Sequence, residues 1–205
     1  VNAAEYGFPQ RRIRVFIVAR RAKSFKVDAS SFLQSDGILA RALPVKQTSD
    51  DPKIIDLSMD ASTISAKFNV GGSSSPFLNS GVYWKGCAFT FRLEARHSGG
   101  KETLGDVLVP DSDVPSEYFI DNQRVEEWRY LKGSKSIDRV HKDSGTSYKY
   151  SEGSMAFPDL LTNPSRTILT GEGGTSPSRF KHIIKTKKGF RRLTPVELER
   201  LNGFP

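Results

Sequence analysis

A glycine-rich segment near the C-terminal end is followed by side chains that can donate hydrogen bonds to phosphate oxygens. Gly171, Gly173 and Gly174 allow the backbone to turn tightly and to approach a partner closely. Glu172, between them, is an acceptor of the kind that pairs with a cytosine amino group. The pattern predicts contact with a polyphosphate partner, through the donors Ser176, Ser178, Arg179, Lys181 and His182.

A second group of such side chains lies near the start of the chain. Gln10, Arg12 and Arg14 occupy alternate positions after the turn Gly7-Phe8-Pro9. Each guanidinium is a rigid fork of donors that matches a pyrimidine O2 or a phosphate. The alternative is that the arginines merely flank an edge strand, which is the better interpretation of spaced arginines without further context.

The positive charge of the chain gathers in these two regions. The formal net charge is +8. Residues 1–21 hold five arginines against one glutamate, and residues 165–205 hold nine basic side chains against three glutamates. The intervening residues hold 17 basic and 19 acidic side chains. A basic run by itself favours a solvated surface, but charge that coincides with two motifs is typical of nucleic-acid binding.

The two regions together resemble the cytosine-5 DNA methyltransferase family. Residues 191–205 read RRLTPVELERLNGFP and match its late motif, Arg-x-Leu-(Thr/His)-Pro-x-Glu-x-x-Arg-(Leu/Val)-x-Gly-(Phe/Tyr)-Pro. Residues 10–14 match its Gln-x-Arg-x-Arg element, and Thr167-Ile168 resembles the Thr-Leu element of its target recognition region. The resemblance implies that Arg14 helps to hold a flipped cytosine and its phosphate, and that Gln10 and Arg12 line the same pocket.

The resemblance also implies chemistry that this sequence does not supply. The family transfers a methyl group from S-adenosylmethionine to carbon 5 of cytosine, through a cysteine that follows a proline. Cys87, the single cysteine, follows Gly86 and is interpreted as a small buried residue. The glycine-rich cofactor motif and the Glu-Asn-Val segment of the family are also missing from the sequence.

We therefore expect a DNA-recognition fragment of a DNA (cytosine-5-)-methyltransferase, from a bacterial restriction–modification pair and inactive alone. Its expected partners are double-stranded DNA and the missing catalytic domain. S-adenosylmethionine is expected to serve the parent enzyme and not to bind this fragment. Two alternatives stay open, a natural second subunit of a split methyltransferase and a non-catalytic DNA-binding module; Val1, in place of an initiator methionine, favours the fragment.

Three regions are predicted from the resemblance. Residues 1–21 would end the catalytic domain, residues 22–190 would form the target recognition domain, and residues 191–205 would start a C-terminal helical segment. Within the second region, the loop 171–176 is expected to read bases while charged side chains clamp the DNA backbone. The predicted DNA-binding residues are Arg166, Thr167, Ile168, Gly171, Glu172, Gly173, Gly174, Thr175, Ser176, Ser178, Arg179 and Lys181.

The predicted fold class is α+β, with a β-rich, irregular recognition domain that contains short helices. The apolar run inside Arg12–Ala19 predicts a buried strand of a methyltransferase sheet that is mostly missing. Without that sheet we expect the strand to pair elsewhere in the chain, to associate with a second copy, or to be poorly ordered. Further strands are predicted at 82–96, as a strand or a bent hairpin arm with a bulge at Gly86, and at 166–170, and a hairpin is predicted at 137–150. Helices are predicted at 30–43, 58–67, 103–108, 122–131, with Asn122 as the cap, and from Thr194, with Gly203 as the stop.

Composition is that of a folded, loop-rich protein. Hydrophobic residues make up 37% of the 205 residues, and there are 17 glycines and 11 prolines. A single cysteine excludes an intramolecular disulfide. No metal site is expected, because the pair Asp50-Asp51 is interpreted as part of a loop. The segment 70–76 is also interpreted as a loop. No apolar run is of membrane-spanning length, and the single cysteine favours a reducing, cytosolic setting. The resemblance implies a bacterial, nucleoid-associated protein.

Overall fold

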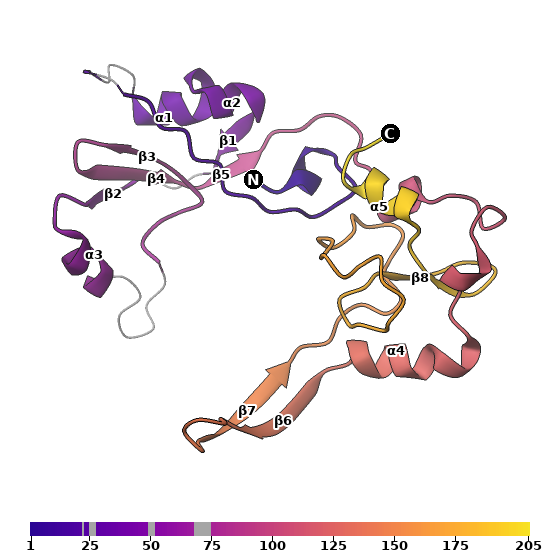
Figure 1. The fold of residues 1–205 in the computed structure, drawn as a ribbon. Helices are drawn as coiled ribbons and strands as arrows, with labels where there is room; N and C mark the ends of the chain where they lie inside the picture. The colour runs from indigo at the N-terminus through magenta and orange to yellow at the C-terminus, as the bar shows by residue number, and fades with distance from the viewer. Residues whose placement is uncertain (22, 25–27, 49–51, 68–74) are drawn as a thin grey trace. The chain divides into compact units, whose positions relative to one another are not determined.

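The computed structural model describes residues 1–21, 23–24, 28–48, 52–67 and 75–205. Asp50 and Asp51 lie outside these residues, as does most of the predicted loop 70–76. The fold is mixed, with short helices and small antiparallel sheets (Figure 1). Two compact units are present: one contains Val1 and Arg14–Gly99, and the other contains Asn2–Ile13 and Gly100–Pro205. The predicted functional boundaries at residues 21 and 190 stay predictions.

The first unit combines short helices with two small antiparallel sheets. The predicted helix at 30–43 is present in three pieces, and its first turn is capped by the side chain of Asp28, which accepts from the Ser31 amide at 2.7 Å. The helical elements are α1 (Ala29–Ser31), a π-helical turn η2 (Phe32–Asp36), α2 (Ile38–Ala42) and α3 (Ala61–Lys67). The sheets pair β1 (Val45–Gln47) with β5 (Leu93–Ala95), and β2 (Lys53–Asp56) with β4 (Cys87–Phe91) and β3 (Ser80–Trp84).

The predicted strand at 82–96 is a hairpin followed by a separate short strand. Lys85 and Gly86 form the two-residue turn between β3 and β4, with φ angles of 46° and 85°. Positive φ at both positions matches the right-handed twist of the two strands, so Gly86 belongs to the turn and does not form the bulge that the sequence suggested. Cys87 begins β4 and is half-buried.

The predicted buried strand inside Arg12–Ala19 is wrong. Residues 14–20 form no strand, and the side chains of Val15 and Ile17 are 84% and 88% exposed. Two-sided burial requires layers on both faces, and the described residues supply none here. The segment therefore presents an apolar surface formed by Val15, Phe16, Ile17 and Val18.

The second unit is assembled from short elements around one apolar cluster. The cluster consists of Leu104, Val107, Ile184, Leu193 and Leu201, so the C-terminal segment shares a core with residues that precede it by about one hundred positions. The elements are the 3₁₀ turns η1 (Ala3–Tyr6), η4 (Leu104–Val107), η5 (Ser116–Tyr118) and η6 (Asn122–Arg124), the helices α4 (Val125–Lys132) and α5 (Pro195–Leu201), and the antiparallel pairs β6 (Lys135–Val140) with β7 (Ser147–Glu152) and β8 (Ile183–Lys185) with β9 (Phe190–Arg192).

Several local predictions hold in this unit and two do not. The helical turn after Thr103, the helix at 122–131, the hairpin at 137–150 and the helix from Thr194 are confirmed. The cap of the 122–131 helix is Asp121 instead of Asn122, because the Asp121 carboxylate accepts from the Gln123 amide at 2.9 Å. The strand at 166–170 is absent, and only Ser165 forms an isolated bridge, with Gln10.

A buried ion pair holds α5 to the rest of the unit. Arg191 and Glu197 are both fully buried, and the guanidinium donates to the two carboxylate oxygens at 2.9 and 2.7 Å. Glu197 also accepts from the amides of Thr194 at 2.7 Å and Val109 at 3.1 Å. Burial acts to lower the pKa of Arg191, but hydrogen bonds and charge from Glu197 outweigh it and raise the pKa.

The predicted helix stop is also confirmed. Gly203 has a φ of 85°, its amide donates to the carbonyl of Arg200 at 2.9 Å, and the Phe204 amide donates to that of Glu199 at 3.1 Å. This is the Schellman arrangement, which favours glycine at the left-handed position. No helix in the described part of the chain is long and apolar enough to cross a membrane.

Replacing Glu197 with alanine should strongly destabilise the protein. The substitution leaves Arg191 charged and buried without its main partner, which costs about 3–5 kcal/mol. Urea denaturation measures the loss. The matched control is Glu127→Ala, which removes an exposed pair with Arg124 of 3.1 Å and should cost no more than about 1 kcal/mol. Equal losses in the two variants would contradict the role given to Glu197.

Candidate nucleic-acid interface

The predicted pocket segment near the N-terminus lies beside the start of the predicted recognition segment. The amide of Ser165 donates to the carbonyl of Pro9 at 2.7 Å, and the amide of Arg11 donates to the carbonyl of Ser165 at 2.8 Å. The Thr167 hydroxyl donates to the carbonyl of Arg11 at 2.6 Å. Two segments separated by more than 150 residues are thus joined through backbone groups, and side chains on both can serve one ligand.

The three predicted pocket residues have different surroundings. Gln10 is buried, and its side-chain amide has no hydrogen-bond partner among the described residues. Arg12 is half-buried, and it donates to the side chain of Asn202, just after α5, at 3.4 Å. Arg14 is exposed and belongs to the first unit, where its amide and carbonyl bond to Val1. Its proximity to Gln10 and Arg12 stays a prediction.

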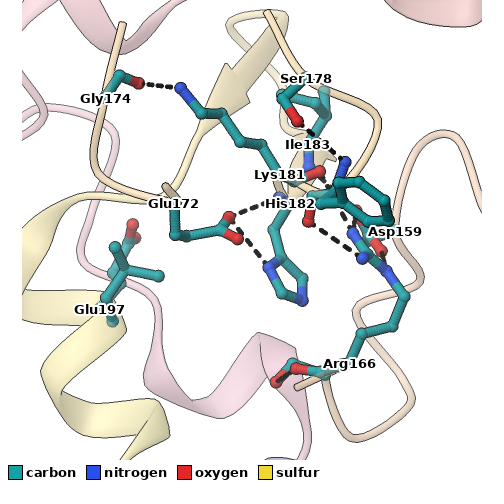
Figure 2. Close-up of polar contacts among 12 residues, drawn as sticks. Asp159, Arg166, Glu172, Gly174, Ser178, Lys181, His182, Ile183 and Glu197 are labelled. Atoms are coloured by element: carbon teal, nitrogen blue, oxygen red, sulfur yellow. Dashed lines mark hydrogen bonds and ion pairs between the residues drawn. The ribbon is translucent and has the colours of Figure 1, made fainter. Parts of the chain in front are cut away.

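A network of buried charges connects Arg166, in the predicted recognition segment that starts at Ser165, to Asp159 (Figure 2). The Asp159 carboxylate accepts from the Arg166 guanidinium at 2.9 and 3.3 Å and from the Ile183 amide at 2.9 Å. The Lys132 ammonium lies 3.5 Å from Asp159 and donates to the carbonyl of Lys181 at 2.6 Å. Arg166, expected to clamp DNA, is therefore occupied inside the protein.

For both Asp159 and Lys132, burial and the opposite charges nearby shift the pKa in opposite directions. Burial acts to raise the pKa of Asp159, but the hydrogen bonds from Arg166 and the charges of Lys132 and Arg166 outweigh it, so the pKa lies below the ordinary value. For Lys132 burial prevails over the attraction of Asp159, and its pKa is lowered. The carboxylate is thus the group whose ionised form the fold stabilises.

Lys181 holds the glycine-rich loop through hydrogen bonds to its backbone carbonyls. The Lys181 ammonium donates to the carbonyls of Gly174 and Ser176, the latter at 2.6 Å (Figure 2). The Arg192 guanidinium adds a bond of 3.0 Å to the same Gly174 carbonyl. Burial, reinforced by the charge of Arg192, lowers the pKa of Lys181. Lys181 thus bonds to the loop from within the protein, and its contact with phosphate stays a prediction.

Glu172 is directed into the protein. Its carboxylate accepts from the His182 amide at 2.5 Å and lies 3.0 Å from the His182 ring nitrogen Nδ1, and both side chains are buried (Figure 2). Glu172 thus has an internal partner, and its contact with a cytosine amino group stays a prediction. His182 is a packed residue.

Arg179 joins the loop to the hairpin formed by β6 and β7. Its guanidinium forms an ion pair with the carboxylate of Glu152, at the end of β7, and donates to the carbonyl of Gly153 at 2.6 Å. Its side chain is therefore not free to contact a phosphate in this conformation. The loop that precedes Arg179 and the base of the hairpin are held together by this contact.

The surface that remains available on the loop consists mainly of backbone and small side chains. Gly171, Gly173, Gly174, Thr175 and Ser176 are exposed. The three glycines have no positive φ, and a Cβ atom at Gly171 or Gly173 would meet nothing within 4 Å. The turn itself does not require glycine here, and close approach of a partner at the two residues stays a prediction.

Other predicted contacts are partly buried. Ile168 packs against the apolar cluster, and the Ser178 hydroxyl accepts from the Phe180 amide at 3.4 Å. No pattern in the sequence pointed to Lys132, Glu152 or Asp159 as functional or structural partners. A lysine at the end of an amphipathic helix is ordinarily exposed, so no pattern in the sequence separates Lys132 from a surface residue.

One cavity lies beside the glycine-rich loop. It is the larger of the two described, with a volume of about 400 Å³, and is lined by Leu169, Thr170, Gly171, Glu172, Phe180 and Lys181. No group of three or more His, Cys, Asp or Glu side chains that could hold a metal ion occurs in the described ranges.

The family described as C-5 cytosine-specific DNA methylase matches residues 1–205. The chain belongs to this family. Type II methyltransferase M.Sau3AI of Staphylococcus aureus, a methylase relative, is 33% identical over 213 residues. The alignment covers 100% of this chain and 49% of the relative, so the chain spans about half of that protein's length. No solved structure matches this methylase chain.

The buried network predicts a specific loss of stability in acid. A carboxylate whose pKa is lowered by folding stabilises the protein above its unfolded pKa of about 3.9, and this contribution is lost as the pH falls through the lower folded value. The unfolding free energy of Asp159→Asn should therefore fall less below about pH 4 than that of the unmodified protein. Urea denaturation at neutral and acidic pH measures this, with the exposed Asp138→Asn as control. The same acid dependence in Asp159→Asn and the unmodified protein would contradict it.

Proposed function

We propose that this chain is the DNA-recognition part of a DNA (cytosine-5-)-methyltransferase, of the type that works in a bacterial restriction–modification system. The observation that carries the proposal is the pairing of residues 9–11 with Ser165 and Thr167, which joins the Gln-x-Arg-x-Arg element to the recognition segment. Family membership and the type II methyltransferase relative support the reaction class. The site of action would be the cytoplasm, at the nucleoid.

Gln10 is the residue best suited to the proposed target-cytosine pocket. A buried amide without partners costs free energy, and a ligand that pairs with its oxygen and nitrogen recovers that cost. Cytosine offers both donors and acceptors on its pairing edge. Arg12 and Arg14 would add donors to the base or to its phosphate, as in the family pattern.

Methyl transfer itself would depend on a catalytic part that lies outside these residues. S-adenosylmethionine supplies the methyl group in this family. The described residues do not form a fitting site for it, since Glu172 and Lys181, the charged groups of the larger cavity, already bond to other parts of the protein. Cys87 lies half-buried in β4 of the first unit and does not follow a proline. We assign the cofactor and the nucleophile to the catalytic part.

The exposed apolar segment favours a partner that covers it. Val15, Phe16, Ile17 and Val18 are each more than half exposed, and apolar surface of this kind is stabilised by burial. A catalytic sheet would supply that cover, either in the same polypeptide or as a second subunit of a split enzyme. The second arrangement is the alternative that this observation supports, and association of two copies through the segment would be a further outcome.

Assays of the purified 205-residue chain test the proposal. We expect binding to duplex DNA but no methyl transfer from S-adenosylmethionine, because the nucleophile and the cofactor site are assigned elsewhere. Gel-shift titration and incorporation of labelled methyl groups measure the two properties. Activity that appears only when the part of the relative outside the matched 49% is added would support a split or divided enzyme. Turnover by the chain alone, or a failure to bind any duplex, would overturn the proposal.

Substitution of the loop glycines tests the proposed approach to DNA. Gly171→Ala and Gly173→Ala add a methyl group to open space, so thermal stability should be unchanged or slightly raised. Duplex binding should weaken if the backbone approaches DNA closely, by about tenfold for a clash of roughly 1.4 kcal/mol. Gly100→Ala is the matched control, since a Cβ atom there also meets nothing within 4 Å. Unchanged binding in both loop variants would exclude close approach at these positions.

A further inference from the structure

The β6–β7 hairpin is an uncovered two-stranded ribbon. Residues 136–140 and 147–149 are exposed, and Figure 1 shows the hairpin extending from the end of α4. The antiparallel register places Ile137 opposite Tyr150 and Arg139 opposite Tyr148. Residues directly opposite one another share a face of the ribbon. We name as the aromatic face the residues Lys135, Ile137, Arg139, Tyr148, Tyr150 and Glu152, and as the serine face Ser136, Asp138, Val140, Ser147, Lys149 and Ser151.

The aromatic face carries positive charge that the protein itself does not neutralise. Its carboxylate, Glu152, accepts from the Tyr150 hydroxyl at 2.6 Å and pairs with Lys135 at 3.8 Å and with Arg179. The Arg139 guanidinium lies 3.8 Å from the centre of the Tyr150 ring, and it forms no ion pair with a carboxylate among the described residues. On the serine face, by contrast, Lys149 lies directly opposite Asp138.

Stacking on the Tyr150 ring orients Arg139 to bind a planar ligand that carries hydrogen-bond acceptors. A guanidinium that lies on an aromatic ring loses side-chain freedom but keeps its hydrogen-bond donors. Next to it, Ile137 and Tyr148 are 42% and 40% exposed and offer apolar contact. Phosphate oxygens and the O6 and N7 atoms of guanine are acceptors that match the fork, and a thymine methyl group matches the apolar neighbours.

We propose that the aromatic face of the β6–β7 hairpin binds duplex DNA, with Arg139 as its principal donor. The major groove admits a two-stranded β-ribbon, which is the form of this hairpin. The ion pair between Arg179 and Glu152 holds the base of the hairpin to the recognition loop, so one duplex would contact both. This inference rests on the proposed function and adds to it a second contact surface, away from the glycine-rich loop.

One substitution on each face of the hairpin tests which face binds DNA. Arg139→Ala and Lys149→Ala each remove one exposed cation, from the aromatic face and the serine face respectively. Fluorescence anisotropy with labelled duplexes of varied sequence, on the 205-residue chain, should show a loss of about ten- to hundredfold for Arg139→Ala and less than about twofold for Lys149→Ala. Arg139→Lys keeps the charge without the fork and should be intermediate, and circular dichroism melts establish that every variant is folded.

The outcomes distinguish the two proposals. A loss confined to some sequences would identify Arg139 as a base contact, whereas a uniform loss with a salt slope reduced by about one unit would identify a phosphate contact. Equal effects of Arg139→Ala and Lys149→Ala, or none, would overturn the hairpin surface while the proposed function stands. A protein partner on the aromatic face, such as a second copy seen by light scattering and lost in Arg139→Ala, would overturn it as well. No duplex binding by the unmodified chain would overturn both.

Discussion

The ion pair between Arg191 and Glu197 is the contact on which the second unit most depends. Two opposite charges are fully buried, and their removal from water is compensated only because the carboxylate accepts two bonds from the guanidinium and two from backbone amides. One of those amides, that of Val109, lies 88 residues away. The family motif in residues 191–205 is therefore a structural element: it fastens the last helix to the core from which the recognition segment extends.

Basic side chains of the C-terminal region bond to groups inside the protein. Arg166, Lys181 and Arg192 donate to Asp159 or to backbone carbonyls and so determine the shape of the glycine-rich loop. What such a loop presents outward is backbone and small side chains. The hydrogen bonds from Lys181 and Arg192 restrain the loop before a partner binds. A restrained surface loses less conformational entropy on binding.

One contact joins the two surfaces that we propose for DNA. The loop offers close approach of its backbone, while the β6–β7 hairpin offers a cation stacked on an aromatic ring. Arg179 connects the end of the loop to the end of β7 through Glu152. The pocket residues Gln10 and Arg12 lie in the same unit. Recognition of sequence and capture of the target base would thus depend on one folded body. The apolar segment at residues 15–18 belongs to the first unit, where the proposed catalytic part would cover it.

Local patterns in the sequence determined the family, the helix that begins after Thr194, the turn after Thr103 and the hairpin at 137–150. Caps, turns and strand alternation act between residues a few positions apart, so they can be predicted without knowledge of the fold. The partners of Arg166, Glu172, Arg179 and Lys181 were decided only by the tertiary structure. A charged side chain in a sequence shows what it can donate or accept, but not whether an internal group or a ligand will meet it. The exposure of residues 15–18 was decided in the same way, since burial of an apolar run depends on a neighbour that lies elsewhere.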